Sequence, residues 1–210
     1  MKIAIIANPT QQQVLLSRGV SASLELVWLD QWKETLQADV CIDLLFEENE
    51  NHRALLEKWQ QEHKGIVLVS SVTTTASQLP IDFIRFNGWD GFLENEIIEL
   101  AGGTIPQRAM VEQVLNGLHR KAEWVQDQVG FIAPRVIANI INEAYLALEE
   151  KVSDKAQIDI AMQLGTNYPM GPFAWSQKIG LKKVYQLLLA MSKENNRYHP
   201  AYLLAKEAND

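Results

Sequence analysis

The 210-residue sequence predicts an α/β domain followed by an all-α domain. Two observations support this prediction. In the first 127 residues, short apolar runs alternate with helical segments, which is typical of a mostly parallel sheet covered by helices. From about Gln128 onward, apolar residues recur at intervals of three and four, the period of amphipathic helices. We therefore predict one domain over 1–127 and a second over 128–210.

Apolar runs rich in β-branched residues predict the strands of the first domain, over 2–7, 24–30, 40–45, 65–70 and 81–88. The turn signal Asn8-Pro9 ends the first of these runs. A helix is predicted over 51–63, because apolar residues share one of its faces. Segment 94–101 is predicted to be a short strand or a loop, and a further helix is predicted over 106–120.

The second domain is predicted to begin with an amphipathic helix, along which lie Ile137, Ile140, Ile141, Ala144, Tyr145 and Leu148. Ser153-Asp154 offers an N-cap for the next helix, and Gly165 a C-terminal stop just after Leu164. Another helix is predicted to begin near Pro172, and a last one to span 181–191.

The composition of the sequence argues against several classes of binding partner, bound metal and targeting segment. The net charge of −7 argues against nucleic acid and anionic membranes. Cys41 is the only cysteine, which excludes an internal disulfide and a thiolate metal cluster, and its apolar neighbours predict a core position. The four histidines lack metal-ligand spacing, so no metal is expected. Neither a signal peptide nor a membrane span is recognisable, and a cytoplasmic protein is expected.

Four motifs of the helical half together point to a known family: Gly130-Phe131-Ile132-x-x-Arg135, Asn142-Glu143-Ala144, Ile158-Asp159-x-Ala161-Met162 and Tyr168-Pro169-Met170-Gly171-Pro172. They resemble the C-terminal domain of the 3-hydroxyacyl-CoA dehydrogenases. The resemblance implies a trimmed Rossmann-like domain before the helical domain, and a homodimer formed through the helical domain. Most of the motif residues are interpreted as structural, forming a helix start, a polar packing pair and a Pro/Gly turn.

The resemblance also shows what the first half lacks. In the family the first strand leads into Gly-x-Gly-x-x-Gly, which brings the NAD pyrophosphate to a helix N-terminus. Here Ala7, Pro9 and Gln12 occupy the glycine positions. Pro9 has no N–H to donate, and Gln12 places a long side chain where close packing needs none. Ordinary NAD binding is therefore not expected, and NAD is implied as cofactor only if activity is retained.

The region after the second predicted strand matches the family at one residue and lacks one of the family's segments. Asp30 lies where the family's ribose-binding acid falls, although an aspartate in a turn or at an N-cap is the alternative. Only about eight residues separate Asp30 from the third predicted strand. The family has a long helical insertion there that contributes to the coenzyme A site, so one substrate-binding element is predicted to be deleted.

The catalytic positions implied by the resemblance are also altered. The family's general base is a histidine in a Gly-Leu-His-Phe-Phe-Asn-Pro segment, and the matching segment 88–93 places Asp90 at the histidine position. An exposed aspartate, with a pKa near 4, is a poor acceptor for an alcohol proton near neutral pH. Glu99 matches the glutamate that orients the histidine, although a structural or solvated acid is the alternative.

The remaining matches concern ligand contacts. Thr73 keeps a hydroxyl where the family has a substrate-contacting serine, whereas Pro134 replaces an active-site asparagine. Glu47 stands in an acidic cluster that is interpreted as a solvated loop, with a remnant of a family glutamate as the alternative. Trp89 and Trp175 are expected either to fill the cleft or to pack in the core.

Three functions are compatible with these residues. The first is a degenerate family member that binds an acyl-CoA-like ligand or a protein partner without efficient hydride transfer. The second is a working NAD-dependent dehydrogenase of 3-hydroxyacyl-CoA, with Asp90 or water as the base. The third is a different small-molecule enzyme that uses Asp90, Glu99 and Thr73 in the vacated cleft.

Overall fold

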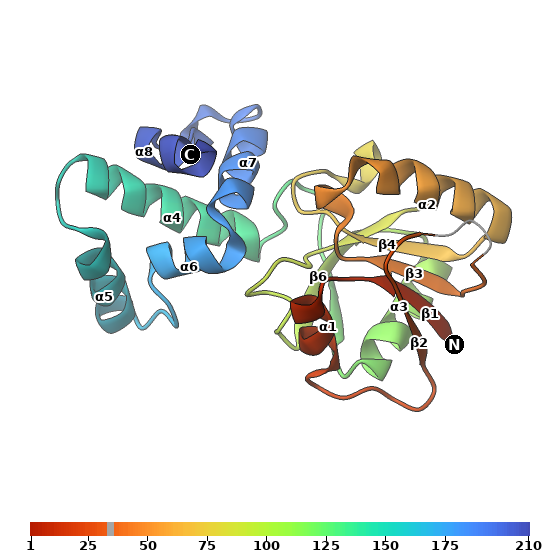
Figure 1. Ribbon diagram of the computed structural model, residues 1–210. Helices are drawn as coiled ribbons and strands as arrows, with labels where there is room; N and C mark the ends of the chain where they lie inside the picture. The colour runs from red at the N-terminus through yellow and green to blue at the C-terminus, as the bar shows by residue number, and fades with distance from the viewer. Residues whose placement is uncertain (33–35) are drawn as a thin grey trace. The chain divides into compact units, whose positions relative to one another are not determined.

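A computed structural model describes residues 1–32 and 36–210 of the protein. The chain forms two compact units, Met1–Phe131 and Ile132–Asp210 (Figure 1). The first is an α/β unit and the second is all-helical, which confirms the predicted fold class. None of the described helices is long and apolar enough to cross a membrane.

The described part of the α/β unit contains one seven-stranded sheet in the order β2-β1-β3-β4-β5-β6-β7. Its strands are β1 (Lys2–Ile6), β2 (Glu25–Leu29), β3 (Val40–Asp43), β4 (Ile66–Ser70), β5 (Ile84–Phe86), β6 (Ile97–Gly102) and β7 (Lys121–Trp124). Neighbouring strands are parallel except β5 and β6, which run antiparallel. The sheet is therefore mostly parallel, as predicted.

Helices cover both faces of this sheet (Figure 1). They are α1 (Pro9–Leu16), α2 (Glu50–His63) and α3 (Ile105–Gly117), with short 3₁₀ turns η1 (Phe46–Glu48) and η2 (Ala76–Gln78). Side chains alternate along β1, so that Ile3 and Ile5 pack with α1 and α3, whereas Ala4 and Ile6 pack with α2. Cys41 is fully buried on the α2 face, as predicted, and burial raises the pKa of its thiol.

Two elements of this unit were not predicted, and both have local causes. The sequence predicts a turn at Asn8-Pro9, but Asn8 caps α1 and Pro9 stands in its first turn, where a missing N–H costs nothing. Strand β7 has the sequence Lys-Ala-Glu-Trp, and none of its residues is buried. An edge strand of this kind carries no apolar run that would reveal it.

The helical unit consists of α4 (Ala133–Glu149), α5 (Lys155–Thr166), α6 (Pro172–Ile179), α7 (Leu181–Ser192), η3 (Asn196–Tyr198) and α8 (Tyr202–Asn209). The predicted stop at Gly165 is wrong. Helix α5 continues to Thr166 and is capped by Asn167, which has φ 57° and donates its N–H to the Met162 carbonyl. Asparagine tolerates this left-handed conformation better than most residues. Asp154 caps the same helix, as predicted.

Candidate functional site

The candidate site of the α/β unit lies at the carboxyl edge of its sheet. Because β1, β3, β4 and β5 are parallel, the segments that follow them emerge at one edge. The antiparallel β6 starts at this edge, where its Glu99 lies beside the end of β5. The crevice of a doubly wound sheet forms where successive connections leave in opposite directions, which here is between β1 and β3.

Glu47 organises the part of the edge that follows β3 and β4. Its Oε1 accepts the Val72 N–H at 2.9 Å, the Thr73 N–H at 2.7 Å and the Thr73 hydroxyl at 2.6 Å. Its Oε2 accepts the indole N–H of Trp89 at 2.9 Å. Glu47 is exposed as a residue, but its carboxylate fastens two loops together. The interpretation of a merely solvated acid missed this role.

Trp89 is buried at the same edge, with 2 % of its surface exposed. Its ring is fixed by the bond to Glu47, and the Thr73 hydroxyl has its proton directed at the same carboxylate. Thr73 therefore offers a ligand only its oxygen lone pairs. Trp175 is also buried, within the helical unit.

Asn87 is the side chain that the structure pairs with Glu99. It follows β5 directly, and its backbone N–H donates to the Glu99 carbonyl at 3.0 Å. Its side-chain Nδ2 donates to Glu99 Oε2 at 3.1 Å. Asn87 was not among the predicted site residues. Asp90 lies three residues further on, half-buried in the turn after β5.

Arg85 lies in β5 and bonds several of the segments that form this edge. It is fully buried, donates through Nε to Asp127 at 2.7 Å and through its terminal nitrogens to the carbonyls of Ser71 and Gln128. Burial lowers the pKa of Arg85, while the negative charges of Asp127, Glu47 and Glu99 oppose that effect. The carboxylates of Glu47 and Glu99 thus both interact electrostatically with the buried Arg85 guanidinium. The groups around Glu47 and around Glu99 are therefore close enough to form parts of one site.

Asp127 completes that support. Burial by itself would raise the pKa of Asp127, but the N–H groups of Ala76 and Ser77 and the Arg85 guanidinium outweigh burial and lower it. The carboxylate accepts from Ala76 at 2.9 Å and from Ser77 at 3.2 Å. It thereby ties the segment after β7 to the loop after β4.

The start of α1 does not fit a dinucleotide pyrophosphate. The Asn8 side chain accepts the Gln11 N–H at 2.9 Å, and the Gln11 side chain accepts the Asn8 N–H at 2.9 Å. Gln12 turns its amide back onto the Ala7 carbonyl at 3.0 Å, and Pro9 has no N–H. A phosphate needs free N–H groups at a helix start, and here two of them are already bonded to side chains.

Asp30, the predicted ribose contact, is exposed and follows β2 directly. The register pairs Leu29 with Ile6, so Asp30 lies at the same edge as the start of α1. The connection to β3 is short, as the sequence shows, and residues 33–35 within it lie outside the described part. Asp30 therefore lies at the same sheet edge as the start of α1, whose N–H groups do not suit a pyrophosphate.

A buried carboxylate occupies the β3 side of the same crevice. Asp43 is fully buried and accepts the Trp32 indole N–H at 2.9 Å and the Leu45 N–H at 2.9 Å. His52 Nδ1 lies 2.8 Å from the same carboxylate. The sequence does not reveal this cluster, because Trp32 lies before β3, Asp43 ends β3 and His52 lies in α2. Among the described residues, no group of acids, histidines and cysteine is arranged to hold a metal.

The motifs of the helical unit have structural roles. The Asp159 carboxylate accepts the N–H groups of Phe173 and Ala174 at 2.8 and 3.0 Å, and so caps α6. A Cβ on Gly171 would lie 2.3 Å from Asp159, which explains the glycine. Asn142 is buried and bonds the His199 carbonyl and the Ala201 N–H at 3.0 and 2.8 Å.

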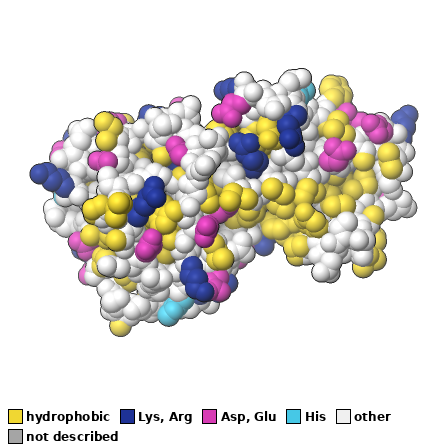
Figure 2. Space-filling view, turned by 180° about the vertical axis from the view of Figure 1, so that it is seen from behind, with side chains coloured by type: hydrophobic (Ala, Val, Ile, Leu, Met, Phe, Trp, Pro, Cys, Tyr) yellow, Lys and Arg dark blue, Asp and Glu magenta, His cyan; other side chains and the backbone are white. Residues whose placement is uncertain are grey.

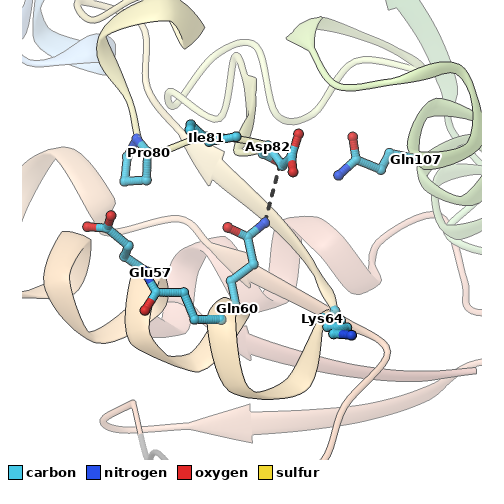
Figure 3. A pocket seen from close by; sticks show the side chains of 9 residues that line it. Glu57, Gln60, Lys64, Pro80, Ile81, Asp82 and Gln107 are labelled. Atoms are coloured by element: carbon cyan, nitrogen blue, oxygen red, sulfur yellow. Dashed lines mark hydrogen bonds between the residues drawn. The ribbon is translucent and has the colours of Figure 1, made fainter.

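A hollow of about 420 Å³ lies at the opposite edge of the sheet (Figure 3). Figure 3 shows polar side chains of α2 facing the segment before β5, with Gln60 donating to the Asp82 carbonyl at 3.5 Å. Asp82 precedes β5 and Gly65 precedes β4, so the hollow is remote from the carboxyl edge. The hollow is therefore no part of the candidate site.

The fold defines a Rossmann-like domain followed by a helical C-terminal domain. Residues 130–209 match the family model of the 3-hydroxyacyl-CoA dehydrogenase C-terminal domain. The helical unit therefore belongs to this domain family, and the chain as a whole is similar to 3-hydroxyacyl-CoA dehydrogenases.

Two curated relatives illustrate the similarity. The 3-hydroxybutyryl-CoA dehydrogenase of Bradyrhizobium diazoefficiens is 25% identical over 215 residues, covering 96% of this chain and 73% of that protein. The 3-hydroxyadipyl-CoA dehydrogenase of Escherichia coli is 29% identical over 152 residues, covering 70% of this chain and 32% of that protein. The match thus spans about a third of the Escherichia coli relative.

Solved structures agree on the fold. FadB2 of M. tuberculosis superposes with a TM-score of 0.81 at 12% identity, covering 99% of this chain and 93% of that one. The (S)-3-hydroxybutyryl-CoA dehydrogenase PaaH1 of Ralstonia eutropha gives a TM-score of 0.76 at 18% identity, covering 98% and 92%. At such identities the likeness establishes the architecture alone.

Proposed function

We propose that this chain is a 3-hydroxyacyl-CoA dehydrogenase-like protein that binds an acyl-CoA-like ligand and has lost efficient NAD-dependent hydride transfer. The observation that carries the proposal is the closed start of α1, where Asn8 and Gln11 bond each other's backbone N–H groups. A pyrophosphate would have to displace both bonds, and Pro9 would still supply no donor.

The position beside Glu99 supports the same conclusion. The resemblance implies that this glutamate orients a histidine base, and the side chain bonded to Glu99 in this chain is Asn87. We propose that Asn87, rather than Asp90, occupies the base position. A carboxamide does not take up an alcohol proton near neutral pH, so the site retains hydrogen bonding but not general-base chemistry. Glu99 and Thr73 then act as ligand-positioning residues.

The test is a titration of the full chain with NADH, followed by nicotinamide fluorescence and by heat. We expect no saturation up to millimolar NADH, while the same preparation binds an acyl-CoA in the heat measurement. A variant with Ala7, Pro9 and Gln12 all changed to glycine is the control, and it should gain affinity for NADH. Micromolar binding by the unmodified chain would overturn the proposal and favour a working dehydrogenase.

We also propose that two copies of the chain associate through the helical unit. All twelve residues of α5 are described and none of them is buried. Ile160 is 53 % exposed and Leu164 85 % exposed on this helix, and Val136 of α4 is 48 % exposed. Figure 2 shows apolar side chains gathered over the helical unit. An exposed apolar area of this kind is typical of an association surface, and twofold pairing is the commonest solution.

A further inference from the structure

One buried acceptor at the carboxyl edge has no protein partner. Asn87 is 3 % exposed, and its Oδ1 makes no hydrogen bond to the part of the chain that the structure describes. Buried side-chain oxygens are nearly always hydrogen-bonded, since an unmade bond costs the full desolvation of the group. This atom therefore calls for a donor that the described residues do not supply.

The orientation of the Asn87 amide is fixed by its neighbours. Nδ2 donates to Glu99 Oε2, and the adjacent backbone N–H of Asn87 donates to the Glu99 carbonyl. The opposite amide orientation would bring Oδ1 against an acceptor-only carboxylate. Oδ1 consequently points away from Glu99 and presents only lone pairs.

We infer that Asn87 makes this site selective for the hydroxy form of its ligand over the oxo form. A hydroxyl on the ligand donates its proton to Asn87 Oδ1, whereas a carbonyl oxygen would face the amide oxygen with no proton between them. A site built to hydrogen-bond one ligand group rejects a ligand of similar shape that lacks the group, because binding that ligand leaves a buried polar atom of the protein unpaired. Oδ1 is covered by the protein in this structure, so a ligand hydroxyl reaches it only when the surrounding side chains move. The inference rests on the proposed acyl-CoA-like ligand.

The same geometry distinguishes Asn87 from a titratable side chain. Imidazole accepts a hydrogen bond when neutral and donates one when protonated, so it can pair with an alcohol or with a ketone. An amide whose Nδ2 is held by Glu99 can only accept at its other end. Preference for the alcohol is thus built into the residue and does not vary with pH near neutrality.

The test compares three ligands on the full chain by calorimetry: 3-hydroxybutyryl-CoA, acetoacetyl-CoA and butyryl-CoA. They share the coenzyme and differ at C3, which carries a hydroxyl, a carbonyl or no oxygen. We expect 3-hydroxybutyryl-CoA to bind about tenfold more tightly than acetoacetyl-CoA or better. Asn87→Leu should bring the two Kd values within about threefold of each other. Asn95→Leu, an exposed change of the same kind, should keep the preference.

The outcomes separate this inference from the function on which it rests. Binding of all three ligands with equal Kd values, or tighter binding of acetoacetyl-CoA, would overturn the role of Asn87 and leave acyl-CoA binding in place. No binding of any of the three at millimolar concentration would overturn the proposed function, and the selectivity with it. The comparison on the unmodified chain decides the matter even if Asn87→Leu fails to fold.

Discussion

Asp127 supplies the charge that buried Arg85 requires, and this predicts a pH-dependent loss of stability. The pKa of Asp127 is lower in the folded chain than its ordinary value, so its contribution is complete above about pH 4 and is lost as pH falls through the folded pKa. Asp127→Ala should lower the free energy of unfolding by about 3 kcal/mol at neutral pH. The gap to the unmodified chain should narrow as the pH is lowered from about 5 toward 2.

Urea unfolding of both proteins across that pH range measures the gap. Exposed Glu57, changed to alanine, serves as the control and should alter stability by no more than about 0.5 kcal/mol. A gap for Asp127→Ala that is the same at pH 7 and pH 2.5 would show that its carboxylate is not what holds the Arg85 cation.

For single residues, the family resemblance names some of the side chains that lie at the carboxyl edge of the sheet. Glu99 and Thr73 do lie at the edge of the sheet, but which side chain meets Glu99 depends on strand register. The pairing of Phe86 with Leu100 places Asn87 beside Glu99, whereas the match of segment 88–93 to the family's histidine segment names Asp90. The role of Glu47 does not follow from the sequence for a similar reason, because its partners are distant along the chain and become neighbours only in the folded sheet.

Two glycines on either side of the α5–α6 turn should respond in opposite ways to alanine. Gly171→Ala would place a Cβ 2.3 Å from Asp159 and push away the carboxylate that caps α6, costing on the order of 2 kcal/mol. Gly165 lies inside α5 with nothing within 4 Å of its added Cβ. Gly165→Ala should therefore stabilise by about 0.5–1 kcal/mol through helix propensity.

Thermal and denaturant unfolding of the two variants provide the measurement, with near-ultraviolet circular dichroism to follow the helical unit. If Gly171→Ala proved as stable as the unmodified chain, Asp159 would not be fixed at the start of α6. A loss of stability in Gly165→Ala would mean that α5 is not helical at this position.

Helices and strands were predictable from the sequence where their buried side chains produce a recognisable apolar pattern. The runs that became β1, β3 and β4 are buried almost throughout and were visible in the sequence. Edge strand β7 and the short C-terminal helix α8 carry few buried residues, so their patterns resemble those of loops. The end of α5 was misplaced because Asn167 took the role expected of Gly165.

For the whole molecule, the two periodicities were sufficient to predict the fold class. A buried parallel sheet produces continuous apolar runs, whereas packed helices produce a 3.6-residue repeat, and the two occupy separate halves of the chain. Function does not follow from that architecture, because it depends on a few edge residues that can change while the core stays intact. Here those edge residues are the capping pair Asn8 and Gln11 at the start of α1 and the pair Asn87 and Glu99 after β5.

Association through the helical unit makes a prediction for the whole molecule. The double change Ile160→Glu and Leu164→Glu places two charges on the exposed face of α5, where each would lose water on pairing. Sedimentation at micromolar concentration should show a dimer for the unmodified chain and a monomer for this variant, with the circular dichroism spectrum unchanged. Ile81→Glu is the matched control, because Ile81 is 86 % exposed on the α/β unit and should leave the dimer intact. A dimer that survives the double change but dissociates with Ile81→Glu would assign the contact to the α/β unit, and a monomeric unmodified chain would refute pairing at these concentrations.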